Sequence, residues 1–377
     1  MDISEFLKSY PGVTVATDKD NQDILNFFGQ TQIQGRGMSI VYDRTPDFFA
    51  FLKLHSPRML VFIYRGKEGD IQGVATMLFR RGYVNGAEKE ICYLGDLRMG
   101  FDRKGAVLWR QIYGEFFARK KEIDQLKDVD LFYTCLIDDN ELSQRSLARN
   151  KKSGFAYHRV CPYSMVTLML QKPFSSSREN TAALRVLRSP SQEQLQKFYY
   201  EHEKPVHAGY LFSTEISTRL KTWPDFAEEN FLAVEKDGRL LASAALWSPR
   251  SCKKIILSQV PWHLSLFFSL ARMFSFGRFR FQGELKVLYV THLVFDPKLS
   301  SAERNEVFRA LLKEAWQIRA EQGYHFLSFC DFKESSLLEA TGSFIVNRVP
   351  MAIHEVTGAQ DPVPSQQKEY GFEMALV

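Results

Sequence analysis

Dense apolar segments alternate along this chain with segments in which apolar residues recur at helical spacing. A short apolar run bounded by turn residues is typical of a buried strand, and a period near 3.6 residues is typical of an amphipathic helix. In the N-terminal part, this pattern predicts helices over 18–30 and 47–54, a hairpin over 59–79, a strand over 91–99, a helix after 106, and strands over 130–137, 154–160 and 163–170. Thr45 and Pro46 are the expected cap and first residue of the second helix.

The stretch from Ile91 to Phe117 organises this part of the chain. It is interpreted as a buried strand ending at Met99, a short basic turn at Arg103–Ala106, and an amphipathic helix. A turn that contains glycine and opens a helix leaves backbone N–H groups unpaired at the positive end of the helix dipole. These groups could bind a pyrophosphate. An ordinary strand, turn and helix with a solvated basic turn agrees with the sequence as well.

The same order of elements returns after a Ser-rich linker near 173–180. The second series comprises a strand over 184–187, helices over 192–203 and 213–220, a hairpin over 231–247 around Asp237-Gly238, a strand over 286–295, a helix over 301–321, and strands over 324–330 and 342–349. We interpret this as a duplication with an offset of roughly 190 residues, because each repeat is as long as a domain. The expected domains are residues 1–173 and 181–377, and the expected class is α/β with a mixed sheet.

The second series contains an additional segment of roughly 25 residues between its hairpin and its central strand, longer than usual connections. This insert, near 256–281, is apolar and aromatic, with arginines toward its end. Three interpretations remain open: it packs on the other domain, it covers a ligand pocket, or it lies on a membrane surface through Trp262–Phe281.

Composition narrows the class of protein. Hydrophobic residues are 45% and charged residues 25% of the 377 residues, which is ordinary for a globular protein. The net charge of +5 gives no reason to expect a nucleic acid partner. The five cysteines are scattered and odd in number, so free thiols are expected rather than a metal site, in a cytoplasmic protein. No HExxH, CxxC, GxSxG or Walker pattern occurs.

The order hairpin, long strand, basic turn, helix, strand, Asn-led helix and Gly-Phe strand resembles the GNAT acyltransferase family. The resemblance rests on Tyr93-Leu-Gly-Asp-Leu-Arg-Met99, Arg103–Val107, Asn140 and Gly154-Phe155. It covers most of residues 10–171 and, more loosely, 182–356. In that family the central strand parts from its neighbour, and the gap takes the pantetheine arm of acyl-CoA. The chain as a whole is similar in plan to tandem members.

The resemblance implies a set of residues that bind acetyl-CoA or another acyl-CoA, with no metal. The end of the central strand would pair with the pantetheine arm, and the helix start would bind the pyrophosphate. The residues in question are Leu97, Arg98, Met99, Arg103, Lys104, Gly105, Ala106 and Val107. Asn140 could contact the arm or cap its own helix.

The sequence departs from the family pattern in both halves. The family turn usually reads Arg/Gln-x-x-Gly-x-Gly/Ala, but here Asp102 precedes Gly105 by three residues and Val107 follows it by two. An aspartate is unfavourable near a pyrophosphate unless it turns away or pairs with Arg103. The matching turn of the second half, residues 298–305, has no glycine. We therefore expect the first half to bind CoA, while the reverse assignment remains possible.

The catalytic tyrosine often found in the Asn-led helix of the family is missing here, so other groups must move the protons. Amine acylation needs a base for the amine and an acid for the departing thiolate. Candidate bases are Glu90 and Asp96, and candidate acids are Tyr133 and Cys135. His292 falls on the second central strand where Asp96 falls on the first, if Tyr289 is laid over Tyr93. Each of these residues could instead be a structural member of its strand.

The sequence therefore predicts transfer of an acyl group, most simply acetyl, from acyl-CoA to a primary amine of a small molecule or peptide. A non-catalytic ligand-binding or scaffold protein with the same fold is the alternative, suggested by the missing tyrosine. An aminoacyl or fatty-acyl transferase at a membrane surface is a third possibility, suggested by the Phe-rich insert alone.

Overall fold

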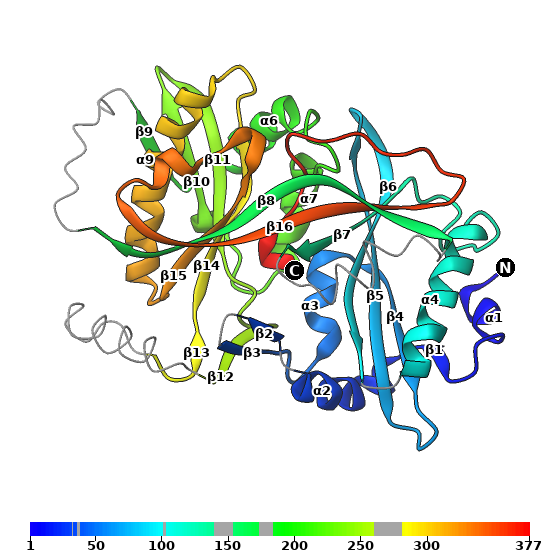
Figure 1. The fold of residues 1–377 in the computed structure, drawn as a ribbon. Coiled ribbons are helices and arrows are strands. Elements are labelled where there is room, and N and C mark those ends of the chain that lie inside the picture. The colour runs from blue at the N-terminus through cyan, green and yellow to red at the C-terminus, as the bar shows by residue number, and fades with distance from the viewer. Residues whose placement is uncertain (32, 36–37, 101–102, 139–153, 173–183, 260–280) are drawn as a thin grey trace.

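The computed structural model describes residues 1–377 except 32, 36–37, 101–102, 139–153, 173–183 and 260–280 (Figure 1). Below, the first half means the described residues up to 172, and the second half those from 184 onward. No described helix is both long and apolar enough to cross a bilayer.

The first half contains four described α-helices and eight strands. The helices are α1 (Ile3–Leu7), α2 (Asn21–Gln30), α3 (Phe48–His55) and α4 (Arg103–Ala118). The strands are β1 (Val13–Val15), β2 (Ile33–Gly35), β3 (Met38–Asp43), β4 (Arg58–Arg65), β5 (Ile71–Val84), β6 (Ala87–Met99), β7 (Leu131–Ile137) and β8 (Phe155–Gln171).

The second half repeats much of this order in its described residues. The helices are α6 (Gln192–His202), α7 (Phe212–Thr222) and α9 (Ser301–Glu321). The strands are β9 (Arg185–Arg188), β10 (Phe231–Lys236), β11 (Arg239–Trp247), β12 (Lys254–Gln259), β13 (Glu284–Leu285), β14 (Val287–Phe295), β15 (Phe326–Phe332) and β16 (Phe344–Gly358).

One 12-stranded mixed sheet runs through both halves, in the order β1-β4-β5-β6-β7-β16-β8-β15-β14-β11-β10-β9. Read from its two ends, the order is matched strand for strand: β6 corresponds to β14, and β7 corresponds to β15. The centre of this pseudo-symmetry lies between β16 and β8, which pair antiparallel along almost their whole length. The strand order therefore supports the duplication that the sequence predicted.

The two halves exchange their last strands. β8 of the first half pairs with β15 of the second half over residues 163–168, and β16 of the second half pairs with β7 of the first half over residues 351–355. Figure 1 shows these two long strands crossing the middle of the molecule side by side. Each half thus borrows a strand that the other half supplies. The predicted domain boundary near 173–181 falls largely in the undescribed segment 173–183 and stays a prediction.

A second sheet also joins the halves, in the order β13-β12-β3-β2. β12, which leads into the insert, pairs antiparallel with β3 of the first half from Lys254–Asp43 to Gln259–Ser39. The flank of the insert therefore contacts the first half, as one of the three interpretations requires. Residues 260–280 themselves, with most of the Trp262–Phe281 surface, lie outside the described part of the chain.

Three clusters of buried side chains form the core. One lies between the sheet and α1 with α4, and one lies between the sheet and α9. The third and largest combines apolar residues of α2 and α3 with those of α6 and α7, so it belongs to both halves. Burial of one continuous apolar cluster favours a single joined structure over two separable lobes.

Several predicted boundaries were wrong. The two strands predicted over 154–160 and 163–170 are one strand, β8, because Pro162 lies within it opposite Ala352 without ending it. Helix α3 is capped by Asp47, whose carboxylate accepts from the Phe49 N–H, and not by Thr45. Strands β5 and β6 are longer than expected and turn at residues 85–86. The basic turn at Arg103–Ala106 is the first turn of α4 and not a loop before it.

Candidate functional site

A gap opens between the two central strands of the first half. β6 and β7 run parallel and pair only over Ile91–Leu131, Cys92–Phe132 and Tyr93–Tyr133. Beyond this point β7 pairs with β16, while β6 stays with β5. Within the described residues, no strand pairs with the β7-facing edge of β6 after Tyr93. An unpaired strand edge offers backbone N–H and C=O groups to a ligand.

A β-bulge lies on β6 just beyond the parting point. Asp96 and Leu97 together oppose one residue of β5, Ala75, and Asp96 has a positive φ of 51°. A bulge adds one residue to a strand and changes the direction of its side chains. Here it bends the edge of β6 at the mouth of the gap, where Leu97, Arg98 and Met99 follow.

Helix α4 begins at Arg103, four residues after the end of β6, so its first turn consists of the residues predicted to bind the pyrophosphate. The free N–H groups of a helix belong to this turn. Gly105 is buried, and a Cβ atom built on it would lie 2.7 Å from Cε1 of Tyr64 and 3.2 Å from Cε of Met99. Glycine here lets the helix start approach β4 and β6 closely. Val107 is 52% exposed, on the outer side of the helix.

Asp96, the first candidate base, forms a bidentate ion pair with Arg44. Nη1 and Nη2 of Arg44 each donate to one carboxylate oxygen of Asp96 at 2.8 Å. Burial would raise the pKa of Asp96, but the positive charges of Arg44, Arg98 and Lys253 outweigh burial and hold it below its usual value. Asp96 is therefore ionised and occupied by Arg44, and its use as a base stays a prediction.

Arg98 and Lys253 complete the charged group around the bulge. Arg98 donates from Nη1 to the backbone oxygen and the hydroxyl of Thr31, at 3.0 and 2.9 Å. Lys253 is 5% exposed, lies over the ring of Tyr42 and donates from Nζ to the backbone oxygen of Val377. Burial, followed by the positive charge of Arg44, lowers the pKa of Lys253 to about 7. At neutral pH, part of this ammonium is therefore uncharged.

Aromatic and thiol groups line the parting point itself. The hydroxyl of Tyr93 and Sγ of Cys135 are 3.3 Å apart. Tyr133 is fully buried, and its hydroxyl accepts from Nη2 of Arg80 at 3.3 Å. Burial raises the pKa of Tyr133 although Arg80 opposes it, so its hydroxyl stays protonated at neutral pH. Tyr133 and Cys135 thus lie beside the gap, as an acid would have to, but in closely packed surroundings.

The structure does not bring Glu90 together with the other candidates. Glu90 lies before the paired segment of β6, so six residues, or about 20 Å of strand, separate it from Asp96. Its carboxylate forms an ion pair with Arg58. Asn140 lies outside the described residues, so its assignment to the pantetheine arm or to a helix cap stays a prediction.

The second half contains the same gap. β14 and β15 run parallel over Val287–Phe326, Leu288–Leu327 and Tyr289–Ser328 and then part. The helix that follows begins differently, because Ser300 and Glu303 form a capping box across its first turn. The hydroxyl of Ser300 accepts from the Glu303 N–H at 3.3 Å, and the Glu303 carboxylate accepts from the Ser300 N–H at 2.8 Å. This helix start already holds a carboxylate, so a phosphate is disfavoured there.

His292, the candidate base of the second half, is fully buried among aromatic rings. Nη1 of Arg219 donates to its Nε2 at 2.9 Å, and its Nδ1 lies 2.9 Å from the hydroxyl of Thr291. Because arginine only donates, Nε2 must be the unprotonated nitrogen. Burial, reinforced by Arg219, lowers the pKa of His292 well below its usual value. The imidazole is neutral, and the lone pair that a base would use is taken.

Sequence reasoning missed Arg44, Lys253 and His55, which all lie near the bulge. The ring of His55 stacks on Tyr93 at 5.1 Å between centroids. Lys253 belongs to the second half and reaches the first only because β12 pairs with β3. The sequence contains no signal for this pairing, since the two strands are more than 200 residues apart. A buried lysine between two rings is recognisable only in the folded protein.

Comparison with known proteins finds likeness in structure and not in sequence. No family model and no curated protein sequence matches the chain. The N-myristoyltransferase of Saccharomyces cerevisiae with bound myristoyl-CoA superposes with a TM-score of 0.58 at 12% identity, over 97% of this chain and 85% of that one. A tandem GNAT protein from the clavulanic acid biosynthesis pathway gives 0.55 at 9%, over 93% and 99%.

A third likeness is to the GCN5-related glucosamine N-acetyltransferase region of a fungal multi-domain GH3 β-N-acetylglucosaminidase. Its TM-score is 0.58 at 14% identity, over 91% of this chain, while this chain spans only 38% of that protein. At these identities the likeness concerns the fold. The chain therefore has the fold of the GNAT acyltransferases in its tandem form, as the sequence pattern predicted.

Proposed function

We propose that this protein is an N-acyltransferase that uses acyl-CoA, most simply acetyl-CoA, and a primary amine of a small molecule or peptide. The observation that carries this proposal is the parting of β6 from β7 immediately before α4 begins. The free edge of β6 suits the amide groups of a pantetheine arm, and the first turn of α4 suits a pyrophosphate. The fold neighbours include a glucosamine N-acetyltransferase region and an N-myristoyltransferase with bound myristoyl-CoA, which supports this class of reaction.

We assign the acyl-CoA to the first half. Its helix begins with Arg103 and Lys104, whereas the helix of the second half begins with the self-capped Ser300 and Glu303. Two cations and free N–H groups favour a diphosphate, while a carboxylate at the same place repels it.

Lys253 is the group best suited to accept the proton of the amine. The charge of Asp96 is already neutralised by its ion pair with Arg44, and Glu90 lies at the far end of the strand. A lysine with a pKa of about 7 is substantially neutral at physiological pH and can take a proton. Lys253→Met should lower kcat and remove the acidic limb of the pH–rate profile, while Lys236→Met, an exposed lysine of the same half, should change neither.

Titration calorimetry with coenzyme A tests the binding site without knowledge of the acyl group or the acceptor. The Arg103→Ala/Lys104→Ala variant should bind at least about tenfold more weakly, because each charge-assisted contact is worth about 1.5–3 kcal/mol. The matched control is Arg185→Ala/Lys236→Ala, which removes two cations from exposed positions of β9 and β10. Equal affinity in the two variants would exclude this site.

The ion pairs around the candidate bases favour one alternative, a protein that binds acyl-CoA without transferring it. Asp96 and Glu90 are both neutralised by arginines, as expected for structural carboxylates. The release of the coenzyme A thiol from acetyl-CoA, measured with a panel of amines, separates the two functions. Release with any of these amines shows transfer and excludes a protein that only binds. Tight coenzyme A binding with no thiol release for any amine of the panel would favour the binding protein, whereas release that Lys253→Met leaves unchanged would exclude only Lys253 as the base.

A further inference from the structure

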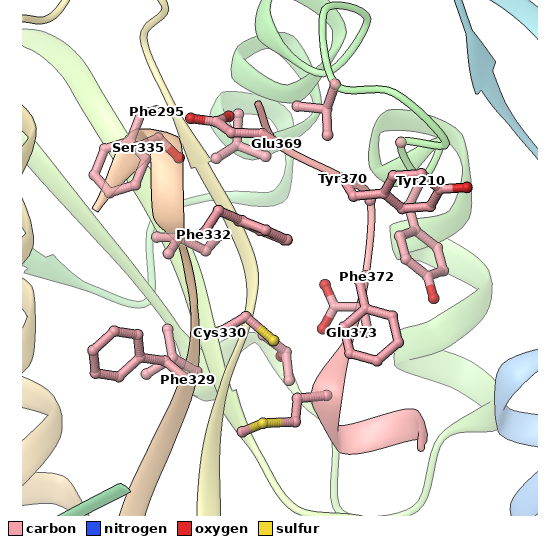
Figure 2. Close-up of a pocket in the computed structure, with 18 of the residues that line it drawn as sticks. Tyr210, Phe295, Phe329, Cys330, Phe332, Ser335, Glu369, Tyr370, Phe372 and Glu373 are labelled. Atoms are coloured by element: carbon pink, nitrogen blue, oxygen red, sulfur yellow. The ribbon is translucent and has the colours of Figure 1, made fainter. Parts of the chain in front are cut away.

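A pocket lies in the strand gap of the second half, at the place that corresponds to the proposed acyl-CoA site of the first (Figure 2). β14 and β15 form two of its walls, and the segment from Glu369 to Met374 closes a third. The empty space is about 860 Å³, part of which is open to solvent. A concave pocket lined mostly by apolar and aromatic side chains, with a few polar groups, is the usual setting for a small organic molecule.

The charges on the pocket wall are predominantly negative. Its lining includes three carboxyl groups, those of Glu203, Glu369 and Glu373, and a single cation, Arg304. Arg304 forms an ion pair with Glu369, so these two charges cancel. Glu203 accepts hydrogen bonds from the N–H and the hydroxyl of Ser213, at 2.9 and 2.6 Å. Glu373 remains as the carboxyl group whose partners are incomplete.

Glu373 is 6% exposed, and Figure 2 shows its carboxyl group directed into the cavity. One oxygen accepts from the backbone N–H of His292 at 2.8 Å. Within the described part of the chain, no lysine or arginine forms a salt bridge with it, and the nearby Arg219 donates to Glu215 and His292 instead. Burial raises the pKa of Glu373 to about 7 against the opposing charges of Arg219 and Arg80. Glu373 is therefore a buried carboxyl group that has no salt-bridge partner among the described residues, and burial of a charge without a partner is costly.

Aromatic side chains line the same pocket as this carboxyl group. Seven of the lining residues are aromatic, and Phe332, Tyr370 and Phe372 are among those that Figure 2 labels. The faces of aromatic rings attract cations, and rings combined with a carboxylate form a recognised setting for ammonium groups. A ligand anion would instead meet Glu373 without a free cation to balance it.

We infer that this pocket binds a small organic cation, an ammonium group with an apolar alkyl or aryl body, whose charge lies against Glu373. The body would occupy the space between β14 and β15, where Phe329 and Leu293 line the wall. This inference does not depend on acyl transfer, because it requires no coenzyme A in either half. A pantetheine arm bound in the same gap is the competing occupant.

Calorimetry on the full chain with 2-phenylethylammonium and its neutral analogue 2-phenylethanol tests the inference. The ammonium should bind saturably at millimolar concentration or below, at least about tenfold more tightly than the alcohol. Glu373→Gln should remove most of that preference. The control Glu235→Gln, at a half-buried carboxylate paired with the exposed Arg185, should keep it.

A second variant guards against misfolding of Glu373→Gln. Ser335 is half-buried at the pocket wall, so Ser335→Trp should fill the space from its rim and abolish binding without touching the core. The inference is overturned if the ammonium does not bind, if the alcohol binds equally well, or if pantetheine competes and Glu373→Gln has no effect. Coenzyme A affinity, measured in the same variants, reports on the first half separately.

Discussion

Asp96 and His292 occupy equivalent positions in two matching β-bulges, one in each half of the molecule. Each is the first of two residues that oppose a single alanine, Ala75 or Ala244, and their φ angles are 51° and 52°. Each also contacts a buried arginine, Arg44 or Arg219. The alignment of Tyr289 with Tyr93, made from sequence, is confirmed by this correspondence.

The two bulges differ in chemistry although their geometry agrees. In the first half a carboxylate and a guanidinium form an ion pair, whereas in the second a neutral imidazole accepts from a guanidinium. A positive φ at a residue other than glycine costs on the order of 1 kcal/mol, so the surrounding contacts must hold it in place. The arginine at each bulge fulfils this role, and the bulge is a feature of the duplicated strand itself.

The pair of Arg44 and Asp96 should therefore stabilise the first half strongly. Arg44→Met leaves the Asp96 carboxylate, 14% exposed, without its ion-pair partner and should cost about 3–5 kcal/mol in the free energy of unfolding. Arg44→Met/Asp96→Asn should recover most of this loss. Urea denaturation measures both, with Arg185→Met as the control, since its exposed pair with Glu235 is worth less than about 1 kcal/mol.

The pH dependence of this deficit has a defined sign. Arg44 holds the pKa of Asp96 below its usual value, so the wild-type pair adds stability that is lost only as the pH falls through that low pKa. Without Arg44, burial raises the pKa, and protonation relieves the buried charge. The stability deficit of Arg44→Met should therefore shrink between pH 7 and pH 4. A deficit that grows over this range would contradict the assignment.

The lowered pKa of Lys253 predicts that the free energy of unfolding changes with pH above pH 7. Its pKa in the folded protein is about 7, below the usual 10.5, so between these values the unfolded chain binds a proton that the folded chain does not. Stability should then rise with pH by up to about 1.4 kcal/mol per unit from this residue. Urea denaturation from pH 7 to 9 should show a smaller slope in Lys253→Met, and an unchanged slope in Lys236→Met.

The sequence predicted those elements whose signals are local. The hairpin at Asp237-Gly238 and the helix over 301–321 have their own turn and cap residues, and both were confirmed. Errors arose where a local signal was overridden by tertiary pairing. Two separate strands were predicted over 154–160 and 163–170, yet β8 continues through Pro162 and pairs with both β15 and β16.

The exchange of β8 and β16 could not be predicted, because it pairs residues far apart in the sequence, such as Tyr163 with Phe332 and Ile137 with Met351, and such pairing leaves no periodic trace in either strand. The candidate site was also predictable only in part. The end of β6 and the start of α4 are adjacent in sequence, so the pattern of residues predicted the strand and the helix after it. The gap beside the strand was expected from the resemblance to the GNAT family, and the structure contains it. Arg44 and Lys253 reach Asp96 from distant elements, so only the folded structure reveals that the carboxylate is already paired.

Gly105 offers a test of the close approach at the start of α4. A methyl group at this position would meet the ring of Tyr64 at 2.7 Å, so Gly105→Ala should lower the free energy of unfolding by about 1–3 kcal/mol. Gly29→Ala in α2 is the matched control, because nothing lies within 4 Å of its added methyl group. The control should stabilise by about 0.5–1 kcal/mol, the usual helical preference of alanine. Equal effects in thermal denaturation would contradict the close approach.

The strand exchange makes each half depend on the other. A fragment of residues 1–172 lacks β16, so the edge of β7 loses its partner over residues 133–137. Exposed strand edges pair with other chains, so this fragment should aggregate when produced alone. A fragment of residues 184–377 should behave similarly, because β8 is absent beside β15.

Co-expression of these two fragments should restore a soluble complex that co-purifies and has the circular dichroism spectrum of the intact chain. The shared cluster of α2, α3, α6 and α7 would add apolar contact to the exchanged strands. As a control, the chain is cut at residues 85–86, in the turn between β5 and β6. This cut separates two strands of the first half that pair over residues 73–84 and 87–99, so it does not involve the exchanged strands. If residues 1–172 are instead monomeric and folded on their own, the exchanged strands are dispensable and the halves are independent domains.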